Sequence, residues 1–410
     1  MKFETLYGQE AAGQRARYRA LEEGFAQQYG DAEGVSFYSA PGRTEIGGNH
    51  TDHNHGHVLA AAVNLDIAAA ARKTQDGKIY LKSKEYEKAD TVDLSDLSRR
   101  PEESESSYAM IKGICARCRE LGYRVEGFEA YTITRVLKGS GLSSSASFEI
   151  LLVTIISQLF NDGQIDPVTA AMIAQYAENV YFGKPSGLMD QMASSVGGVV
   201  SIDFQDESHP KIRKVDFDLN AYDHALCVVD TGGNHADLTN AYAEIPQEMK
   251  AVAAYFGKSV LRELEEETVL KEIPKLRSAV GDRAILRSLH FFEDDRIAAE
   301  EAEALDQGDF QQFLDLVNRS GDSSETRLQN VFANVNPSEQ GLSLALALSK
   351  RLLGKKAACR VHGGGFAGTI QAFVPLSMLS EYRKQMEAVF GEGSCYLLSF
   401  RGVGGVKVEL

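Results

Sequence analysis

The segment "KGSGLSSSASFEILLVTIISQLF", residues 138–160, constrains the fold of this 410-residue chain more than any other. Its two glycines permit a tight loop, and its serines then begin a helix that carries a long apolar run. The alternating run "FEAYTITRVL" comes directly before it and indicates a strand. A strand, a glycine loop and an apolar helix in this order predict a buried helix whose first N–H groups form an anion site.

No G-x-x-x-x-G-K-[ST] sequence occurs in the chain, so this is not a Walker-type loop. The serine hydroxyls remain as candidate donors to phosphate or ligands of Mg²⁺. The alternative is that the serines only cap a buried helix and bind nothing.

Composition excludes several classes of protein. The length favours two or three domains, and a net charge of −15 disfavours nucleic acid and anionic membranes as partners. Five scattered cysteines are too few for a disulfide framework and indicate a reducing compartment. The N-terminus lacks the apolar core of a signal peptide, and no later segment reaches ~18 uninterrupted apolar residues. We therefore expect a cytoplasmic protein.

Helical and strand periodicities are mixed along the chain. Helices are expected at residues 9–29, at 170–182 and over most of 240–320. Strands are expected at 77–86, 128–137, 198–204 and 224–232, and a strand, glycine turn and strand at 355–374. The change from strand-rich to helix-rich character near residues 204–222 is the best candidate for a domain boundary.

The stretch "GGNHTDHNHGH", residues 47–57, contains four of the nine histidines. Zinc is one interpretation, because closely spaced imidazoles can share a metal ion. However, the stretch lacks a second ligand pair and the His-Glu-x-x-His pattern of a catalytic helix. The other interpretations are a polar loop that contacts a substrate and a plain solvated loop leading into the buried segment "VLAAAVNLDIAAAA".

Two further patterns carry weaker signals. The pair Cys115 and Cys118, alone in a helical pattern, is interpreted as two core-facing or half-buried thiols rather than a redox or metal site. The sequence "GGGFAG" at 363–368 satisfies G-x-G-x-x-G, but a strand rather than a helix follows it, so it is not a dinucleotide fingerprint. A tight hairpin and a loop that approaches a ligand both stay open.

Three segments read together change the interpretation. "PGRTEIGGNHTDHNHG", "KGSGLSSSAS" and "RVHGGGFAGT" occur in this order, and they resemble the three motifs of the superfamily that contains galactokinase, homoserine kinase, mevalonate kinase and phosphomevalonate kinase. Within it the chain looks most like the galactokinase family, because "SGLMDQ" resembles that family's C-G-I-M-D-Q and "GGNHADLTNAY" its tyrosine-bearing segment. The resemblance spans roughly residues 37–375.

The resemblance implies an α+β fold of two domains. An N-terminal mixed-sheet domain would occupy residues 1–210 and a C-terminal ferredoxin-like domain residues 211–410, with the active site in the cleft between them. It also implies ATP and Mg²⁺, and small molecules as partners, namely a sugar and a nucleotide. A monomer or weak homo-oligomer is expected.

The resemblance implies a role for each residue that matches a motif of the family. Asp190 and Arg43 would be catalytic, and Asp190 would accept the proton of the sugar's anomeric hydroxyl. The expected sugar contacts are Asn49, His50, Asp52, Gly187 and Tyr242. The expected phosphate-binding residues are Gly139, Ser140, Gly141, Leu142, Ser143, Ser144, Ser145 and Ala146. The expected Mg²⁺ ligands are Ser145 and Glu178.

The chain departs from the family pattern mainly in the first motif. Glu45, Asn49 and His53 stand where the family usually has Asn, Glu and Tyr, and Leu137 stands in place of a proline. These departures bear on substrate identity. Galactose is the expected substrate, and the alternatives are a related sugar, such as N-acetylgalactosamine or arabinose, and a non-catalytic sugar sensor.

Overall fold

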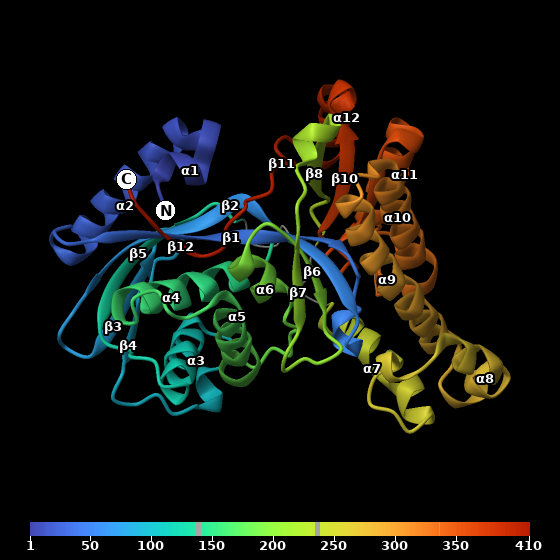
Figure 1. Cartoon of the computed structure of the whole chain (residues 1–410), viewed down its shortest axis with the longest axis horizontal. Helices are drawn as coiled ribbons and strands as arrows, with labels where there is room; N and C mark the ends of the chain where they lie inside the picture. Colours follow the sequence, from blue (N-terminus) through green and yellow to red (C-terminus); the bar gives the residue numbers. More distant parts are fainter. Residues whose placement is uncertain (137–140, 234–237, 336) are drawn as a thin grey trace.

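The computed structural model describes the chain except for residues 137–140, 234–237 and 336. Two β-sheets lie side by side, the first with helices on both faces and the second with helices packed beside it (Figure 1).

The described strands of the first sheet are β1 (Ser36–Gly47), β2 (His57–Lys73), β3 (Lys78–Ser83), β4 (Asp90–Asp93), β5 (Phe128–Thr134), β6 (Val199–Asp203), β7 (Lys211–Val215) and β12 (Val406–Val408). Their order is β12-β1-β2-β5-β3-β4, and β6 pairs with β2 and β7. Among these described strands, only β3 and β5 pair in parallel. The long β2 pairs with β6 along its first half and with β5 along its second.

Strand β2 is the element that the sequence analysis described only as a buried segment. Alanine favours helix over strand, so local propensity does not indicate this strand. Alternate alanines face opposite layers: Ala69 and Ala71 join the core with α4 (Ser144–Phe160), and Ala68 packs with α2 (Ala11–Tyr29). Small side chains on both faces let a helix approach the sheet closely from either side.

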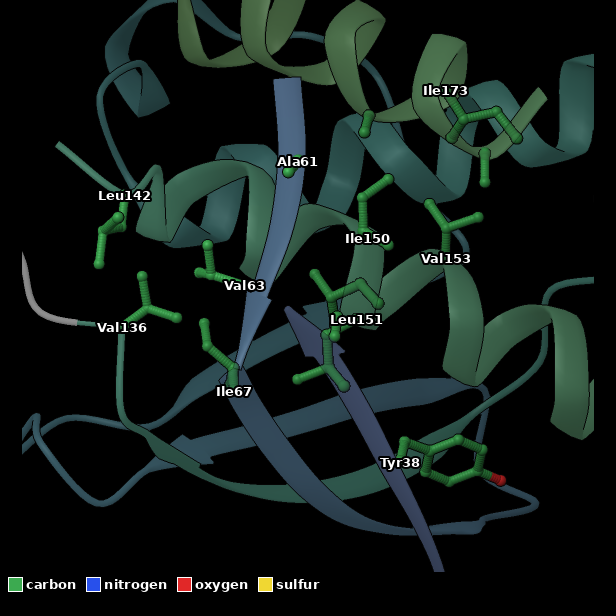
Figure 2. Packing of buried hydrophobic residues seen from close by; sticks show 14 of the residues in the cluster. Tyr38, Ala61, Val63, Ile67, Val136, Leu142, Ile150, Leu151, Val153 and Ile173 are labelled. Atoms are coloured by element: carbon green, nitrogen blue, oxygen red, sulfur yellow. The ribbon is translucent and has the colours of Figure 1, made fainter. Parts of the chain in front are cut away.

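The apolar helix predicted after the serines is confirmed as α4. Figure 2 shows its residues Ile150 and Leu151 on the side of Val63 and Ile67 of β2, and its Val153 toward Ile173, all in one buried cluster. The helices α3 (Ser107–Glu120), α5 (Pro167–Tyr176) and α6 (Met189–Val196) lie on the same face, whereas α1 (Phe3–Tyr7) and α2 cover the other (Figure 1). Cys115 and Cys118 on α3 are buried in this core, which confirms their interpretation as core-facing thiols.

The described strands of the second sheet are β8 (His224–Asp230), β9 (Ala358–His362), β10 (Thr369–Pro375) and β11 (Cys395–Leu398). They lie in the order β11-β8-β10-β9, and all pairs are antiparallel. Between β8 and β9 the chain forms α7 (Thr239–Tyr255), α8 (Glu266–Ala279), α9 (Asp282–Asp306), α10 (Phe310–Ser323) and α11 (Gly341–Leu353), and α12 (Leu376–Phe390) precedes β11. This β-α-β-β-α-β succession is ferredoxin-like, and the expected α+β class is confirmed.

The division of the chain at residue 210 stays a prediction. Strand β7 begins at Lys211 and pairs with β6 of the first sheet, and β12 returns to β1 near the end of the chain. Segments on both sides of the predicted boundary therefore belong to one sheet. None of the helices in the described part of the chain is both long and apolar enough to span a membrane.

Candidate active site

An ion pair between the first strand and a short helix forms the centre of the site. Arg43 lies on β1 and Asp190 in the first turn of α6, and Arg43 Nε lies 2.8 Å from Asp190 Oδ1. The Arg43 side chain is 7% exposed and the Asp190 side chain 29%. Burial alone would raise the pKa of Asp190, but the Arg43 charge and hydrogen bonds from Arg43 and Ser143 hold this pKa below its usual range. Asp190 is therefore an ionised carboxylate that a ligand can reach.

The glycine–serine loop lies directly against this pair. Ser143 donates its hydroxyl hydrogen bond to Asp190 Oδ2, and Arg43 Nη1 donates to the carbonyl of Gly141. The backbone N–H of Arg43 donates to the carbonyl of Leu142 at 3.1 Å. Helix α4 begins at Ser144, directly after Ser143, so its first N–H groups, which have no carbonyl partner within the helix, lie near Asp190.

The expected phosphate-binding residues differ in how they can meet a ligand. Leu142 and Ala146 are buried, whereas the half-buried members are Gly141, Ser143, Ser144 and Ser145. Gly139 and Ser140 lie outside the described residues.

The third motif packs on the same loop at Gly141. Gly141 has a φ of +72°, and a Cβ atom there would lie 2.5 Å from Thr369 Oγ1 and 2.8 Å from His362 Nδ1. Both the backbone conformation and the lack of space therefore require glycine. His362 Nε2 also lies 3.1 Å from the hydroxyl of Thr44 on β1. The three motifs, far apart in the sequence, thus meet at one place.

Glu178 lies in the π-helical turn after α5, with its side chain almost fully buried. Its Oε1 atom accepts hydrogen bonds from Ser145 Oγ at 3.4 Å and from Lys184 Nζ at 2.9 Å. Its Oε2 atom accepts from Ser186 Oγ at 2.6 Å and from Gln191 Nε2 at 2.8 Å. These hydrogen bonds fix the carboxylate with one oxygen toward the serine loop.

The Ser145 and Glu178 pair fits Mg²⁺ by its chemistry. A hydroxyl and a carboxylate oxygen that face each other are the hard ligands that this ion prefers. In the described part of the chain, no three His, Cys, Asp or Glu side chains gather to hold a metal ion by themselves. Mg²⁺ usually takes one or two carboxylates from a protein and its other ligands from phosphates and water.

A second carboxylate, Glu149 on α4, is a residue that the sequence analysis missed. Its Oε2 atom accepts a hydrogen bond from Gln191 Nε2 at 3.0 Å, and its buried Oε1 atom has no partner among the described residues. Burial and the nearby Glu178 raise the pKa of Glu149 well above its usual range. The sequence signal was a charged residue inside the apolar run "FEILLVTII".

The histidine-rich loop folds over the third motif. His50 has a left-handed backbone, with φ of 61°, and its Nε2 atom lies 2.9 Å from the carbonyl of Gly364. Burial, with His53 nearby, lowers the pKa of His50 to about 3, so the ring is neutral. Asp52 lies against Gly187, where a Cβ atom would come within 1.9 Å of Asp52 Oδ2.

Tyr242 reaches the same loop from α7. Its hydroxyl donates to the carbonyl of Gly365 at 2.8 Å, and its ring packs edge-on against Phe366 with centroids 5.3 Å apart. His50 and Tyr242, from distant parts of the chain, therefore contact adjacent carbonyls of the third motif. The segment 363–368 is thus a loop on which candidate ligand-binding side chains converge, as well as a hairpin turn.

Asn49 is placed differently from what its expected role requires. It is fully buried, and its Nδ2 atom donates to Glu45 Oε1 and to the carbonyl of Gly363, both at 2.8 Å. Its Oδ1 atom accepts from Asn330 Nδ2 at 2.8 Å and from Ser324 Oγ at 3.4 Å. An amide has two donors and two acceptor positions, and all are used inside the protein. The role of Asn49 as a sugar contact stays a prediction, and it requires one of these hydrogen bonds to be exchanged for one to the sugar.

Glu45 belongs to the same buried network. Its Oε1 atom lies 2.8 Å from Arg360 Nη2, and the Arg360 side chain also donates to the carbonyl of Ile46. Asn49 and Glu45 thus join the first motif to the third.

The remaining histidines of the loop turn toward different partners. His55 Nε2 lies 3.4 Å from a Glu207 carboxylate oxygen, whereas His57 lies 3.0 Å from Asp295. His50 and His53 have ring centroids 5.8 Å apart. The four imidazoles do not converge on one centre.

Comparison with known proteins supplies the family. Residues 23–73 match the family profile described as the galactokinase galactose-binding signature, and residues 109–198 match the N-terminal domain of the GHMP kinases. The galactokinase of Streptomyces coelicolor is 31% identical over 371 residues, which cover 90% of this chain and 92% of that protein. A galactokinase of Lactococcus lactis is 28% identical, with 95% and 97% covered.

Solved structures agree with these matches. The crystal structure of Lactococcus lactis galactokinase complexed with galactose has a TM-score of 0.83 and 25% identity, and covers 95% of this chain and 100% of that one. The mevalonate kinase of Methanococcus jannaschii has a TM-score of 0.64 at 15% identity, with 90% and 99% covered, which extends the likeness of fold.

Proposed function

This chain belongs to the galactokinase family, and on that premise we propose that it transfers the γ-phosphoryl group of ATP to the anomeric hydroxyl of galactose. The observation that carries the proposal is the pairing of Arg43 with an ionised, partly exposed Asp190 at the opening of the serine helix. Phosphoryl transfer requires an aligned acceptor beside a site that binds anions. Asp190 would align the acceptor hydroxyl, and the start of the serine helix would bind the phosphates.

In the proposed reaction the anomeric oxygen of the sugar forms a bond to the γ-phosphorus. The bond between that phosphorus and the β–γ bridging oxygen breaks, and its electron pair leaves with ADP. The proton of the sugar hydroxyl passes to the carboxylate of Asp190. Because the pKa of Asp190 is low, we expect it to hold and orient the hydroxyl first and to accept the proton as the new bond forms.

Arg43 and the start of α4 would stabilise the negative charge. Arg43 is held by Asp190 and by the carbonyl of Gly141, so its cation is oriented before the substrates arrive. The first N–H groups of α4 favour phosphate oxygens at the same end of the helix. Preorganised donors of this kind lower the barrier because they do not have to reorient during the reaction.

Mg²⁺ would be held by Ser145 and Glu178. It would supply positive charge that neutralises the β- and γ-phosphate oxygens. Ser186 and Gln191 keep the Glu178 carboxylate in place from its other oxygen. That support is typical of groups that orient a ligand to a metal.

The sugar would lie among Asp52, His50, Gly187 and Tyr242, next to Asp190. Gly187 leaves space for Asp52, and the side chains of His50 and Tyr242 border the third motif. The buried Asn49 favours a second candidate, a kinase for a related sugar such as arabinose or N-acetylgalactosamine, since its amide is already hydrogen-bonded to Glu45 and Asn330. A cytoplasmic location and a monomer or weak homo-oligomer stay predictions.

A phosphorylation screen tests the proposal directly. Galactose, N-acetylgalactosamine, arabinose and glucose are each incubated with Mg·ATP, ADP release is followed, and the product is identified by ³¹P NMR. We expect galactose 1-phosphate to have the highest kcat/KM. A far higher kcat/KM for another sugar would move the chain to the second candidate, and no turnover of any sugar would support a non-catalytic sensor.

A further inference from the structure

Lys184 is a cation in the candidate site to which neither the motifs nor the proposed mechanism gives a role. It lies in the loop between the π-helical turn and α6, and its Nζ atom is 2.9 Å from Glu178 Oε1. This is the same carboxylate oxygen that faces Ser145. The Lys184 side chain is 56% exposed, whereas that of Glu178 is 3% exposed.

The backbone of Lys184 is fixed, whereas its side chain is more than half exposed. The N–H groups of Gly183 and Lys184 both donate to the carbonyl of Glu178, at 2.9 and 3.1 Å. Pro185 follows and restricts the next φ angle. The flexible four-carbon stem of lysine can therefore move the ammonium group by several ångströms from a fixed anchor.

The charge around Lys184 is strongly negative. Glu178, Glu149 and Asp190 lie close enough to Lys184 to influence its pKa, and Lys184 in turn is one of the charges, after Arg43, that lower the pKa of Asp190. Among the described residues, Arg43 and Lys184 are the cations that pair with Asp190 or Glu178. Arg43 is 7% exposed and also donates to the carbonyl of Gly141, whereas Lys184 is 56% exposed and has one carboxylate partner, so Lys184 is the cation that can more easily change partner.

Lys184 is the exposed partner of a buried carboxylate that also accepts hydrogen bonds from Ser145, Ser186 and Gln191, so the need to satisfy Glu178 does not by itself explain the position of Lys184. Phosphate oxygens that arrive at the start of α4 would instead offer the ammonium group a multiply charged partner. Lysine acts in phosphate sites as a mobile point charge.

We infer that Lys184 is a further catalytic residue, whose ammonium group leaves Glu178 and binds the phosphates of the nucleotide during phosphoryl transfer. Lys184 stays protonated throughout, so the bonds made and broken are those of the proposed reaction. The inference rests on the proposed phosphoryl transfer.

Three variants test this role. Lys184→Met removes the charge but keeps much of the stem, and Lys184→Arg keeps the charge. Lys350→Met is the matched control, because Lys350 is 41% exposed and pairs with Asp322 at 2.8 Å and with Glu325 at 3.2 Å. Lys184→Arg and Lys350→Met should melt at nearly the wild-type temperature, and Lys184→Met should stay folded, because the buried Glu178 keeps its hydrogen bonds from Ser145, Ser186 and Gln191.

We expect Lys184→Met to lower kcat by ~10²-fold, the loss typical of one preorganised electrostatic donor, with the KM for the sugar unchanged. Calorimetry with ATP in EDTA, without the sugar, should show its metal-free affinity reduced about tenfold. Lys184→Arg should recover part of both losses, and Lys350→Met should match the wild type.

Wild-type kcat together with wild-type affinity for metal-free ATP in Lys184→Met would overturn the inference, since Lys184 would then only neutralise Glu178. Failure of the proposed function is distinguishable. If the wild type phosphorylates no sugar, the calorimetric comparison still decides whether Lys184 contacts the nucleotide.

Discussion

Asp190→Asn is the substitution that examines the proposed chemistry most directly. The change preserves the shape of the side chain and one oxygen acceptor but removes the negative charge and the basic site. Loss of a positioned acid–base group typically lowers turnover by ~10²–10⁴-fold. We expect kcat to fall within this range, and the affinities for galactose and ATP to change by far less.

The effect on stability can be estimated from the ion pair. Loss of one partner of a fully buried pair costs roughly 3–5 kcal/mol. The Asp190 side chain is 29% exposed, and Arg43 keeps its hydrogen bond to the carbonyl of Gly141, so a cost of about 1–2 kcal/mol is expected. This corresponds to a Tm decrease of about 2–8 °C.

The pH dependence of this decrease has a definite sign. The pKa of Asp190 is lowered in the folded protein, so its stabilising contribution is present above the unfolded value of about 3.9 and is lost as the pH falls through the folded value. The Tm difference between wild type and Asp190→Asn should therefore shrink toward low pH.

The matched control is Glu129→Gln, which removes a half-buried carboxylate paired with Arg72 across β2 and β5 at 3.0 Å. It should lower the Tm by a comparable or smaller amount and leave kcat unchanged. The measurements are steady-state kinetics, calorimetric galactose binding and thermal melts. Wild-type turnover in Asp190→Asn, or an equal loss of turnover in Glu129→Gln, would refute the assignment of Asp190.

Further changes have equally definite outcomes. Gly141→Ala should lower the free energy of unfolding by more than the ~1–2 kcal/mol that a left-handed alanine costs, because its Cβ atom would also clash with the third motif. Gly77 has the same φ of +72° and no neighbouring atom within 4 Å, so Gly77→Ala should show only the backbone strain. Equal urea midpoints for the two variants would contradict the packing argument. The Tm of Glu149→Gln relative to the wild type should rise as the pH increases above the unfolded value of about 4.3, because the raised pKa of Glu149 makes the wild type lose stability in that direction. A Tm difference independent of pH would contradict the raised pKa. Elemental analysis of untagged protein should find no stoichiometric zinc, since the four histidines of residues 47–57 do not converge on one centre. The interpretation would be reversed by one zinc per chain in the wild type, if His53→Ala/His55→Ala lost this zinc and had a lower Tm.

The local pattern of apolar residues and glycines was sufficient to predict several helices and strands. The helix α4 and the strands β3, β5, β6, β8 and β9 lie within their expected ranges, and β10 ends one residue beyond its range, at Pro375. Each has a strong apolar pattern or a glycine turn, and neighbouring residues largely determine such patterns. The three motifs and their order also indicated the family that the comparisons show.

What the sequence by itself determined is therefore the local elements, the order of the motifs and the residue types of the candidate site. Only the tertiary structure decided that the alanine-rich β2 is a strand. Its alanines pack against helices on both faces of the sheet, and this packing outweighs the helix propensity of alanine. It also decided that Asn49 is hydrogen-bonded to Gly363 and Asn330, which lie far from it along the chain. The contact between Lys184 and Glu178 was also decided by the tertiary structure. It depends on the fold of the loop between the π-helical turn and α6, and no periodic pattern in the sequence indicates it.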